Sequence, residues 1–283
     1  MNEINFFKND LEKYKIPKEV LELKEKKIEL IQDIRERYGI LFVSTESREG
    51  TRQIGLKDDR EWFRDALGLP VDSDRLKTIY ALEENLPETV TEAGIIIGGS
   101  IYSVYEDLPW IRKLEEFIRI MHQARRPLLG VCFGHQLIAK IFGGEVKRNP
   151  RGIEFGNVSV DLAQEGAIDS LFEGISSQFL APESHQDIIS KLPKMEKTVI
   201  LARNDISAYQ ALAYGKTTRS VQFHPEITPK ILEKIGEALV QSGYLKREQY
   251  LKEFDNLQDT PMARQVLRNF DRNFVLKYHL KKK

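Results

Sequence analysis

The chain has 283 residues, of which 41% are hydrophobic and 30% are charged, as is usual for a globular protein. Lysine plus arginine and aspartate plus glutamate both total 43, and this balance argues against a nucleic-acid or anionic-membrane partner. The longest apolar stretches are too short to cross a bilayer, and the amino terminus lacks the apolar run of a secretory signal. We therefore expect a cytoplasmic protein.

The first predicted element is a helical amino-terminal extension over residues 1–38. Residues 16–39 (IPKEVLELKEKKIELIQDIRERYG) place a proline near the helix start and a glycine at its end. Apolar side chains at helical spacing predict one buried stripe, made of Val20, Leu23, Ile28, Ile31 and Ile34. The charges between them indicate a solvated face.

Strands and helices then alternate. Short apolar runs predict strands at 39–45 (GILFVST), 75–82 (RLKTIYAL), 93–100 (AGIIIGGS) and 127–132 (PLLGVC). Amphipathic patterns predict helices at 61–69 (EWFRDALGL), 109–124 (PWIRKLEEFIRIMHQA) and 134–142 (GHQLIAKIF). This alternation is typical of an α/β core with a parallel sheet, whose ligands lie beyond the carboxyl ends of the strands. The glycine-rich ends GGS and GVCFG should lie at that edge.

The second half has a different pattern. The pattern over residues 151–212 predicts short strands and turns with one brief helix. A last short strand running into a loop is predicted over 220–226 (SVQFHPE), and the helical pattern resumes at Thr228. No linker or compositional break separates two large domains. We therefore predict a helical extension over 1–38, one enzyme-like domain over 39–240, and a helical carboxy-terminal extension over 241–283 that packs on the core.

Cys132 is the only cysteine, so it can form neither an internal disulfide nor a multi-cysteine metal site. A lone cysteine is usually a small buried hydrophobic residue. In GVCFGHQ, however, it stands between an apolar strand and a helix start, as the nucleophile does in a strand–turn–helix elbow. Unpaired N–H groups and positive potential at the helix start favour the nucleophilic thiolate.

A cysteine nucleophile needs a histidine base that a carboxylate orients. The chain has five histidines, and His224 is the one that ends an apolar strand with a carboxylate, Glu226, two residues further on. The HPE tripeptide alone is weak, because a histidine in a turn can simply be solvent-exposed. Together with the elbow it predicts a Cys132–His224–Glu226 triad. No clustered histidine and cysteine ligand set indicates a metal enzyme, and no cofactor is expected.

Amide cleavage also needs hydrogen-bond donors where the carbonyl oxygen becomes negative. The backbone N–H of Phe133, directly after the nucleophile, is one natural donor. The second comes from Gly98 or Gly99, at the neighbouring strand end. A tight turn would also explain these two glycines.

At these residues the sequence resembles the class I, or triad-type, glutamine amidotransferases. The resemblance runs from about Gly39 to about Ala238 and rests on five segments in family order, IIIGGSIYSVYEDLPW, PLLGVCFGHQLIAKIFGGEV, RGIEFG, ESHQD and VQFHPE. It is strongest to the stand-alone branch that is similar to the amidotransferase domain of guanosine monophosphate synthetase. The resemblance implies a flavodoxin-like, three-layer α/β fold with a mostly parallel central sheet and a small added β region.

The resemblance also implies roles for individual residues. Cys132 would attack the glutamine carboxamide and form a γ-glutamyl thioester with release of ammonia. His224 would transfer the proton, and Glu226 would orient the His224 ring. Gly99 and Phe133 would form the oxyanion hole. The substrate-binding residues implied in this way are Gln136, Ser184 and His185.

Several alternatives stay open. A γ-glutamyl peptidase or hydrolase needs the same triad with a roomier pocket, and a non-catalytic binding or regulatory module could keep the fold. An acyltransferase on a similar scaffold is a further alternative, but the GGS and HPE motifs fit the amidotransferases better. No acceptor-activating motif such as a P-loop is present, so an ammonia-accepting synthetase partner would be a separate protein. The helical ends could cover the core, form a homodimer or hold that partner.

Overall fold

The structure is a computed structural model that describes residues 38–195 and 197–282. The chain divides into two compact units, Met1–Tyr38 and Gly39–Lys283. The predicted helix over 16–39 lies outside the described residues except for Tyr38 and Gly39, and its apolar stripe lies wholly outside them.

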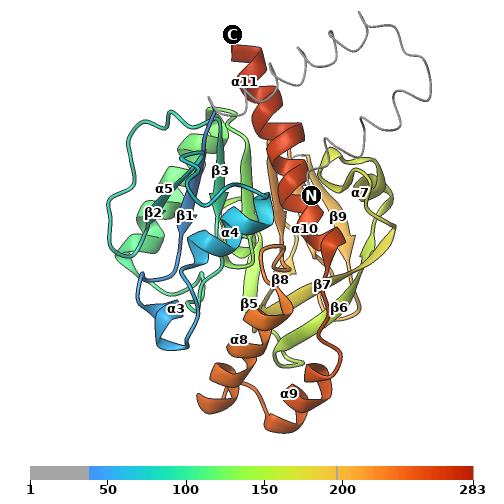
Figure 1. Ribbon diagram of the computed structural model, residues 1–283. Coiled ribbons are helices and arrows are strands. Elements are labelled where there is room, and N and C mark those ends of the chain that lie inside the picture. Colours follow the sequence, from blue (N-terminus) through green and yellow to red (C-terminus); the bar gives the residue numbers. More distant parts are fainter. Residues whose placement is uncertain (1–37, 196, 283) are drawn as a thin grey trace, which may run out of the picture. The chain divides into compact units, whose positions relative to one another are not determined.

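A nine-stranded sheet forms the centre of this unit (Figure 1). Its strand order is β2-β1-β3-β4-β11-β10-β9-β6-β7. The first five strands in that order are mutually parallel, and β10, β9, β6 and β7 continue the sheet in antiparallel pairing. The strand bounds are β1 (Ile40–Ser44), β2 (Leu76–Tyr80), β3 (Gly94–Ile97), β4 (Leu128–Val131), β6 (Glu154–Leu162), β7 (Gln178–His185), β9 (Thr198–Arg203), β10 (Ala211–Tyr214) and β11 (Thr218–Val221). A separate antiparallel pair consists of β5 (Glu145–Arg148) and β8 (Asp187–Lys191).

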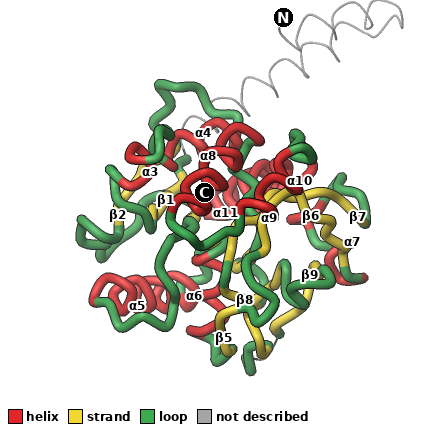
Figure 2. The backbone as a smooth tube through the Cα atoms, turned by 90° about the horizontal axis from the view of Figure 1, so that it is seen from below, coloured by secondary structure: helices red, strands yellow, loops and turns green. Residues whose placement is uncertain are grey.

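Helices cover both faces of the parallel part of the sheet. Figure 2 shows α5 and α6 on one face, and α4 with the carboxy-terminal helices on the other. The helix bounds are α3 (Gly50–Gln53), α4 (Asp59–Leu67), α5 (Pro109–Gln123), α6 (Phe133–Ile141), α7 (Gln164–Ile168), η2 (Ser170–Phe172), α8 (Pro229–Gln241), α9 (Arg247–Phe254), α10 (Pro261–Phe270), η3 (Asp271–Leu276) and α11 (Lys277–Lys282). The result is the expected three-layer α/β fold with a flavodoxin-like core.

The burial of the central strands follows from these layers. Every residue of β1, β3 and β4 is buried, which explains why their sequences are continuous apolar runs without alternation. Helix α5 contributes an apolar stripe at helical spacing, made of Ile111, Leu114, Phe117, Ile118 and Met121. The core therefore fixes the carboxyl ends of β1, β3 and β4 side by side.

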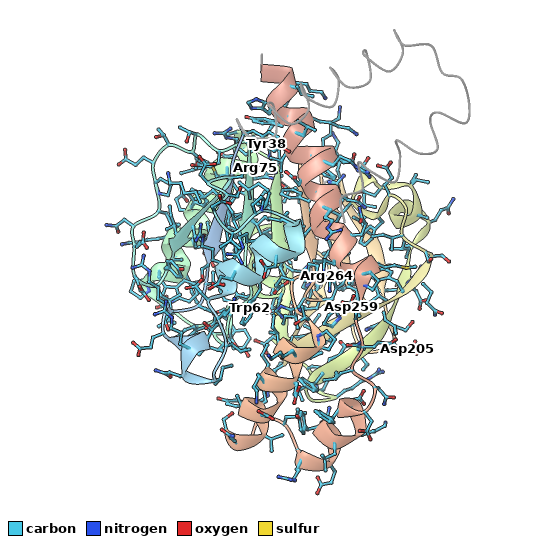
Figure 3. The ribbon with its side chains drawn as sticks, viewed as in Figure 1. Tyr38, Trp62, Arg75, Asp205, Asp259 and Arg264 are labelled. Carbon is cyan, nitrogen blue, oxygen red and sulfur yellow. The ribbon has the colours of Figure 1, made fainter. Side chains whose placement is uncertain are left out.

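The carboxy-terminal helices pack on the second face of the sheet. Arg264 of helix α10 pairs with Asp259 in the preceding loop, and this pairing lowers the pKa of Asp259 (Figure 3). The π-helical stretch η3 lies against β3 so closely that a Cβ atom at Gly94 would be 2.4 Å from the Val275 side chain. Among the described residues no helix combines the length and the apolarity that a membrane crossing requires.

Candidate active site

Cys132 occupies a strained turn between β4 and α6. Its φ of 50° lies in the left-handed region that residues other than glycine rarely adopt, and its ψ is −101°. The side chain is 5% exposed, and the residue caps the amino terminus of α6. Backbone strain of this kind persists only where the surrounding packing enforces it, and it clusters at functional sites.

Two glycines allow the start of α6 to lie against the strand ends. A Cβ atom at Gly130 would be 2.5 Å from the carbonyl oxygen of Gly134, and one at Gly134 would be 2.6 Å from that of Ile97. The Gly134 N–H donates a hydrogen bond of 3.1 Å to the Gly98 carbonyl. The elbow is therefore tied both to β4 and to the loop after β3.

His224 lies in the loop after β11, not in the strand. The last strand ends at Val221, so the segment predicted as strand over 220–226 leaves the sheet earlier than expected. The His224 N–H instead donates a hydrogen bond of 2.9 Å to the Pro182 carbonyl of β7, so the backbone of His224 pairs with β7 and not with β10. The His224 Nδ1 atom lies 2.6 Å from Glu226 Oε1, and both residues are buried.

The site stabilises the charged form of His224. Burial alone would lower the pKa of His224, but the Glu226 carboxylate and the Cys132 side chain beside the ring raise it well above 6.5. Because Nδ1 faces Glu226, the other ring nitrogen is the one left for Cys132. The structure thus brings the three residues of the predicted triad together.

Gly99 lies directly against this group. A Cβ atom there would be 2.8 Å from His224 Cε1 and 3.5 Å from Cys132 Cβ. Within residues 38–195 and 197–282, neither the Gly99 N–H nor the Phe133 N–H donates a hydrogen bond. Thr45 Oγ1 donates to the Gly99 carbonyl at 2.5 Å, and Ser100 Oγ donates to the Thr45 carbonyl at 2.7 Å. The Gly99 N–H and the Phe133 N–H are therefore both uncommitted next to Cys132. Gly99 lies on a loop that is tied to Thr45, directly after β1, and Phe133 begins α6.

Glu46 is a site residue that the sequence interpretation missed. Its Oε1 atom accepts a hydrogen bond of 2.9 Å from the Ile101 N–H, in the same loop as Gly99. Burial raises the pKa of Glu46 to about 7, against the opposing effects of that N–H and of nearby His224. The signal available was its position just past the carboxyl end of β1, where a polar residue lies at the ligand-binding edge.

The three predicted substrate-binding residues have different surroundings. Gln136 and His185 are buried and meet at one acceptor, because Gln136 Nε2 and His185 Nδ1 both lie 2.9 Å from the Asp187 carbonyl. Ser184 is half-buried on β7, opposite Phe155 of β6. The Gln136 Nε2 atom and both ring nitrogens of His185 thus already face protein groups, and a role in substrate binding stays a prediction for all three.

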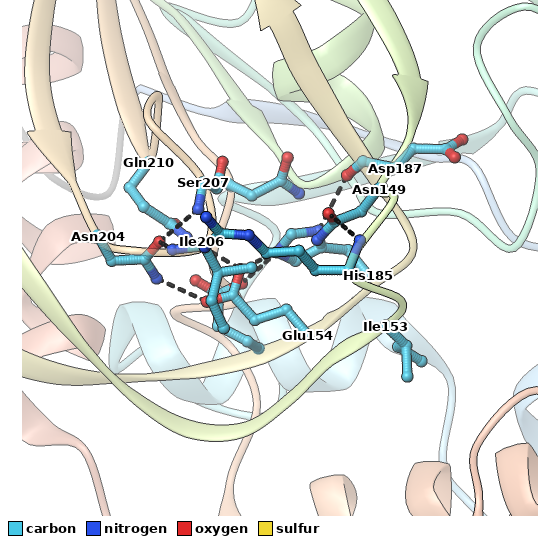
Figure 4. A network of polar contacts seen from close by, with 12 residues as sticks. Asn149, Ile153, Glu154, His185, Asp187, Asn204, Ile206, Ser207 and Gln210 are labelled. Atoms are coloured by element: carbon cyan, nitrogen blue, oxygen red, sulfur yellow. Dashed lines mark hydrogen bonds and ion pairs between the residues drawn. The ribbon is translucent and has the colours of Figure 1, made fainter.

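A buried ionic network surrounds His185 (Figure 4). His185 Nε2 lies 2.9 Å from Glu154 Oε2 and 3.2 Å from Glu183 Oε2. Burial would lower the pKa of His185, but the Glu154 and Glu183 carboxylates beside Nε2 raise it to about 10. Burial, and then the charge of Glu154, raise the pKa of Glu183 to about 7. Neither glutamate was predicted, because a single glutamate in a short strand looks like a solvated side chain.

Known proteins resemble this chain in sequence. The family model for class-I glutamine amidotransferase matches residues 66–238. γ-Glutamyl peptidase 5 of Arabidopsis thaliana is 27% identical over 64% of this chain and 72% of its own length. The glutamine-hydrolyzing GMP synthase subunit of Methanococcus maripaludis is 32% identical over 56% of this chain and 77% of its own length.

Solved structures share the fold. A glutamine amidotransferase of Thermotoga maritima has a TM-score of 0.67 at 17% identity and covers 83% of this chain and 97% of its own. A glutamine amidotransferase of Methylobacillus flagellatus has a TM-score of 0.61 at 21% identity and covers 86% of this chain and 94% of its own. With a family match over residues 66–238 and this fold, the chain belongs to the class-I glutamine amidotransferase family.

Proposed function

We propose that this protein cleaves the side-chain amide of glutamine through a γ-glutamyl thioester on Cys132 and releases ammonia and glutamate. The observation that carries the proposal is the buried arrangement of Cys132, His224 and Glu226 beside two N–H groups that donate no other hydrogen bond within the described part of the chain. Nucleophile, base, orienting carboxylate and oxyanion donors are the parts that acyl transfer to cysteine requires.

The proposed cycle has two halves. The Cys132 sulfur attacks the amide carbon, the N–H groups of Gly99 and Phe133 stabilise the oxyanion, and the C–N bond breaks as the His224 imidazolium protonates the leaving nitrogen. Water then attacks the thioester carbon, gives its proton to His224, and the C–S bond breaks to release glutamate. Glu226 holds the ring throughout through Nδ1.

A second candidate is a γ-glutamyl peptidase, in which an amino acid or amine leaves in place of ammonia. The resemblance to the γ-glutamyl peptidases of Arabidopsis thaliana, at 26–28% identity, favours it. The triad chemistry is the same for both substrates, so the difference lies in the space around the leaving group.

The fate of ammonia is part of the proposal. Several relatives that are 32–37% identical are GMP synthase subunits named as glutamine-hydrolyzing. By analogy, an ammonia-accepting synthetase partner would consume the product of this chain. The sequence also left a homodimer open, and this remains an alternative to the synthetase partner.

To test this proposal, the protein is incubated with glutamine and with a panel of γ-glutamyl peptides, and the released ammonia, glutamate and amine are measured. We expect Cys132→Ala and His224→Asn each to lose activity by about 10⁴-fold. His122→Asn is the matched control, because this half-buried histidine bonds Thr218 on another element and should leave activity unchanged. Turnover that survives in Cys132→Ala would refute the mechanism.

The panel also separates the remaining candidates. Preferential release of ammonia from glutamine supports the glutaminase, and preferential release of amine from peptides supports the peptidase. No turnover, together with a Cys132 that does not react with a thiol-directed glutamine analogue, would favour a non-catalytic module.

A further inference from the structure

Glu183 brings a second buried carboxylate to the environment of His224. The residue lies on β7 with an exposed fraction of 0%. The carbonyl of the preceding residue, Pro182, accepts the His224 N–H at 2.9 Å. The backbone contact that positions His224 therefore also fixes the strand segment from which the Glu183 side chain extends.

The network around Glu183 carries excess negative charge. His185 Nδ1 faces a carbonyl oxygen, which can only accept, and its Nε2 faces carboxylates on Glu154 and Glu183. With its pKa raised to about 10, His185 is an imidazolium with a proton on each ring nitrogen, and it balances only one of the two carboxylates once Glu183 ionises above about pH 7. The ligand atoms of these three side chains lie within 4.8 Å of one another, a spacing that could also enclose a cation, but the imidazolium supplies the required positive charge.

Glu183 and His224 interact electrostatically. The positive charge of His224 lowers the pKa of Glu183, and because such coupling is reciprocal, ionised Glu183 stabilises the His224 imidazolium. The charged or titratable groups that face His224 are Glu226, Cys132, Glu46 and Glu183. Those that face Glu183 are Glu154, His185 and His224. His135, near His185, stays neutral because burial lowers its pKa to about 3.

We propose that Glu183 is a positioning residue that acts with Glu226 to keep His224 in the imidazolium form. It does so from the strand behind the histidine, without touching the substrate. The inference rests on the proposed pairing of Cys132 with His224. Its consequence for the reaction is a proton that stays available on His224 for the leaving nitrogen at higher pH.

The test measures the titration of His224 by nuclear magnetic resonance, without any substrate. All variants carry Cys132→Ala, which removes the coupled titration of the thiol, and the His224 signal is assigned by its loss in His224→Asn. We expect Glu183→Gln to lower the titration midpoint of His224 by about one pH unit, a tenfold change in its protonation constant. This substitution leaves a balanced Glu154–His185 pair, so the variant should fold.

Two variants serve as controls. Glu145→Gln removes the same charge from the exposed strand β5 and should leave the midpoint unchanged. Glu154→Gln removes the other carboxylate from His185, but Glu154 lies opposite His185 in the ladder, away from Pro182, so its effect should be much smaller. Equal shifts in Glu154→Gln and Glu183→Gln would indicate general disruption of the network and would overturn the proposal.

A kinetic measurement extends the test to the Cys132-containing enzyme. With any substrate that is turned over, the alkaline limb of the kcat/KM profile should move to lower pH in Glu183→Gln, while KM changes little. An unchanged His224 midpoint in a folded Glu183→Gln variant overturns the inference, as does a stoichiometric metal ion in the purified protein. Because the titration needs no turnover, it stays decisive even if no γ-glutamyl substrate is found.

Discussion

At the scale of single residues, the absence of a side chain at Gly99 is a steric requirement of the site. A methyl group there would lie 2.8 Å from His224 Cε1, so the ring or the loop would have to move. We expect Gly99→Ala to lower kcat/KM by about 100-fold, the size of effect seen when one oxyanion donor is lost. The measurement is steady-state kinetics beside a thermal unfolding scan. Loss of activity that only accompanies loss of stability would contradict this explanation.

Glu46 should make stability depend on pH. Its pKa is about 7 in the folded protein and 4.5 in the reference state, so between these values the folded chain holds a proton that the unfolded chain has lost. The contribution of Glu46 is therefore present below about pH 4.5 and is lost as the pH rises toward 7. We expect Glu46→Gln to gain stability relative to wild type between pH 5 and pH 7.5.

Urea unfolding at both pH values measures that difference. The glutamine side chain can still accept the Ile101 N–H, so the loop contact is kept. Because Glu183 and Asp59 also have raised pKa values in both proteins, only the difference between wild type and Glu46→Gln is assigned to Glu46. A difference that does not change with pH would contradict the prediction.

At the scale of elements, the contact between β3 and η3 ties the carboxy-terminal segment to the central sheet. A Cβ atom at Gly94 would lie 2.4 Å from Val275 Cγ2 and 3.0 Å from Cγ1. We expect Gly94→Ala to destabilise the protein by about 1–3 kcal/mol through overpacking. In Val275→Ala the colliding methyl groups are gone, so the double variant should be more stable than the sum of the single effects predicts. Denaturant unfolding of the four proteins measures this coupling, and strict additivity would contradict the contact.

The elements near the nucleophile were largely predictable. The apolar run of β3 ends at Gly98 and Gly99, that of β4 runs through Gly130 to Cys132, and the helix start follows at once, so local sequence was sufficient there. The end of β11 was not predictable, because Val221 is followed by residues that are equally compatible with a strand. The bond from His224 to Pro182, which takes the chain out of the sheet, joins residues 42 positions apart in the sequence, and the sequence pattern does not record such a pairing.

At the scale of the whole molecule, the strand order brings the site together. Strand β11 lies beside β4 with Val221 opposite Val131, which places His224 near Cys132 although 91 residues separate them in the chain. The motifs therefore predicted which residues lie close together, but not the strand order that brings them together. The antiparallel extension through β6 and β7 was expected as short strands over 151–212 and, from the resemblance, as a small β region.

The charged residues behind the site mark the limit of sequence interpretation. Glu154 and Glu183 lie inside the segments RGIEFG and ESHQD, but the local pattern separates neither of them, nor Glu46, from the many solvated carboxylates of this chain. Their burial depends on which strands pair and on which faces the helices cover, and this is tertiary information. The proposed triad was predictable because its motifs are local, whereas the buried carboxylates near it come from several strands.

The lone thiol at the elbow also has a consequence for oxidative damage. A thiolate that a peroxide converts to a sulfenic acid is normally rescued by a second cysteine, which traps it as a disulfide. This chain has one cysteine, so Cys132 has no resolving partner within it. Within this chain no second thiol can trap the sulfenic acid, so protection from the irreversible sulfinic and sulfonic acids would come from an external thiol, or from the proposed γ-glutamyl thioester, in which the sulfur is acylated.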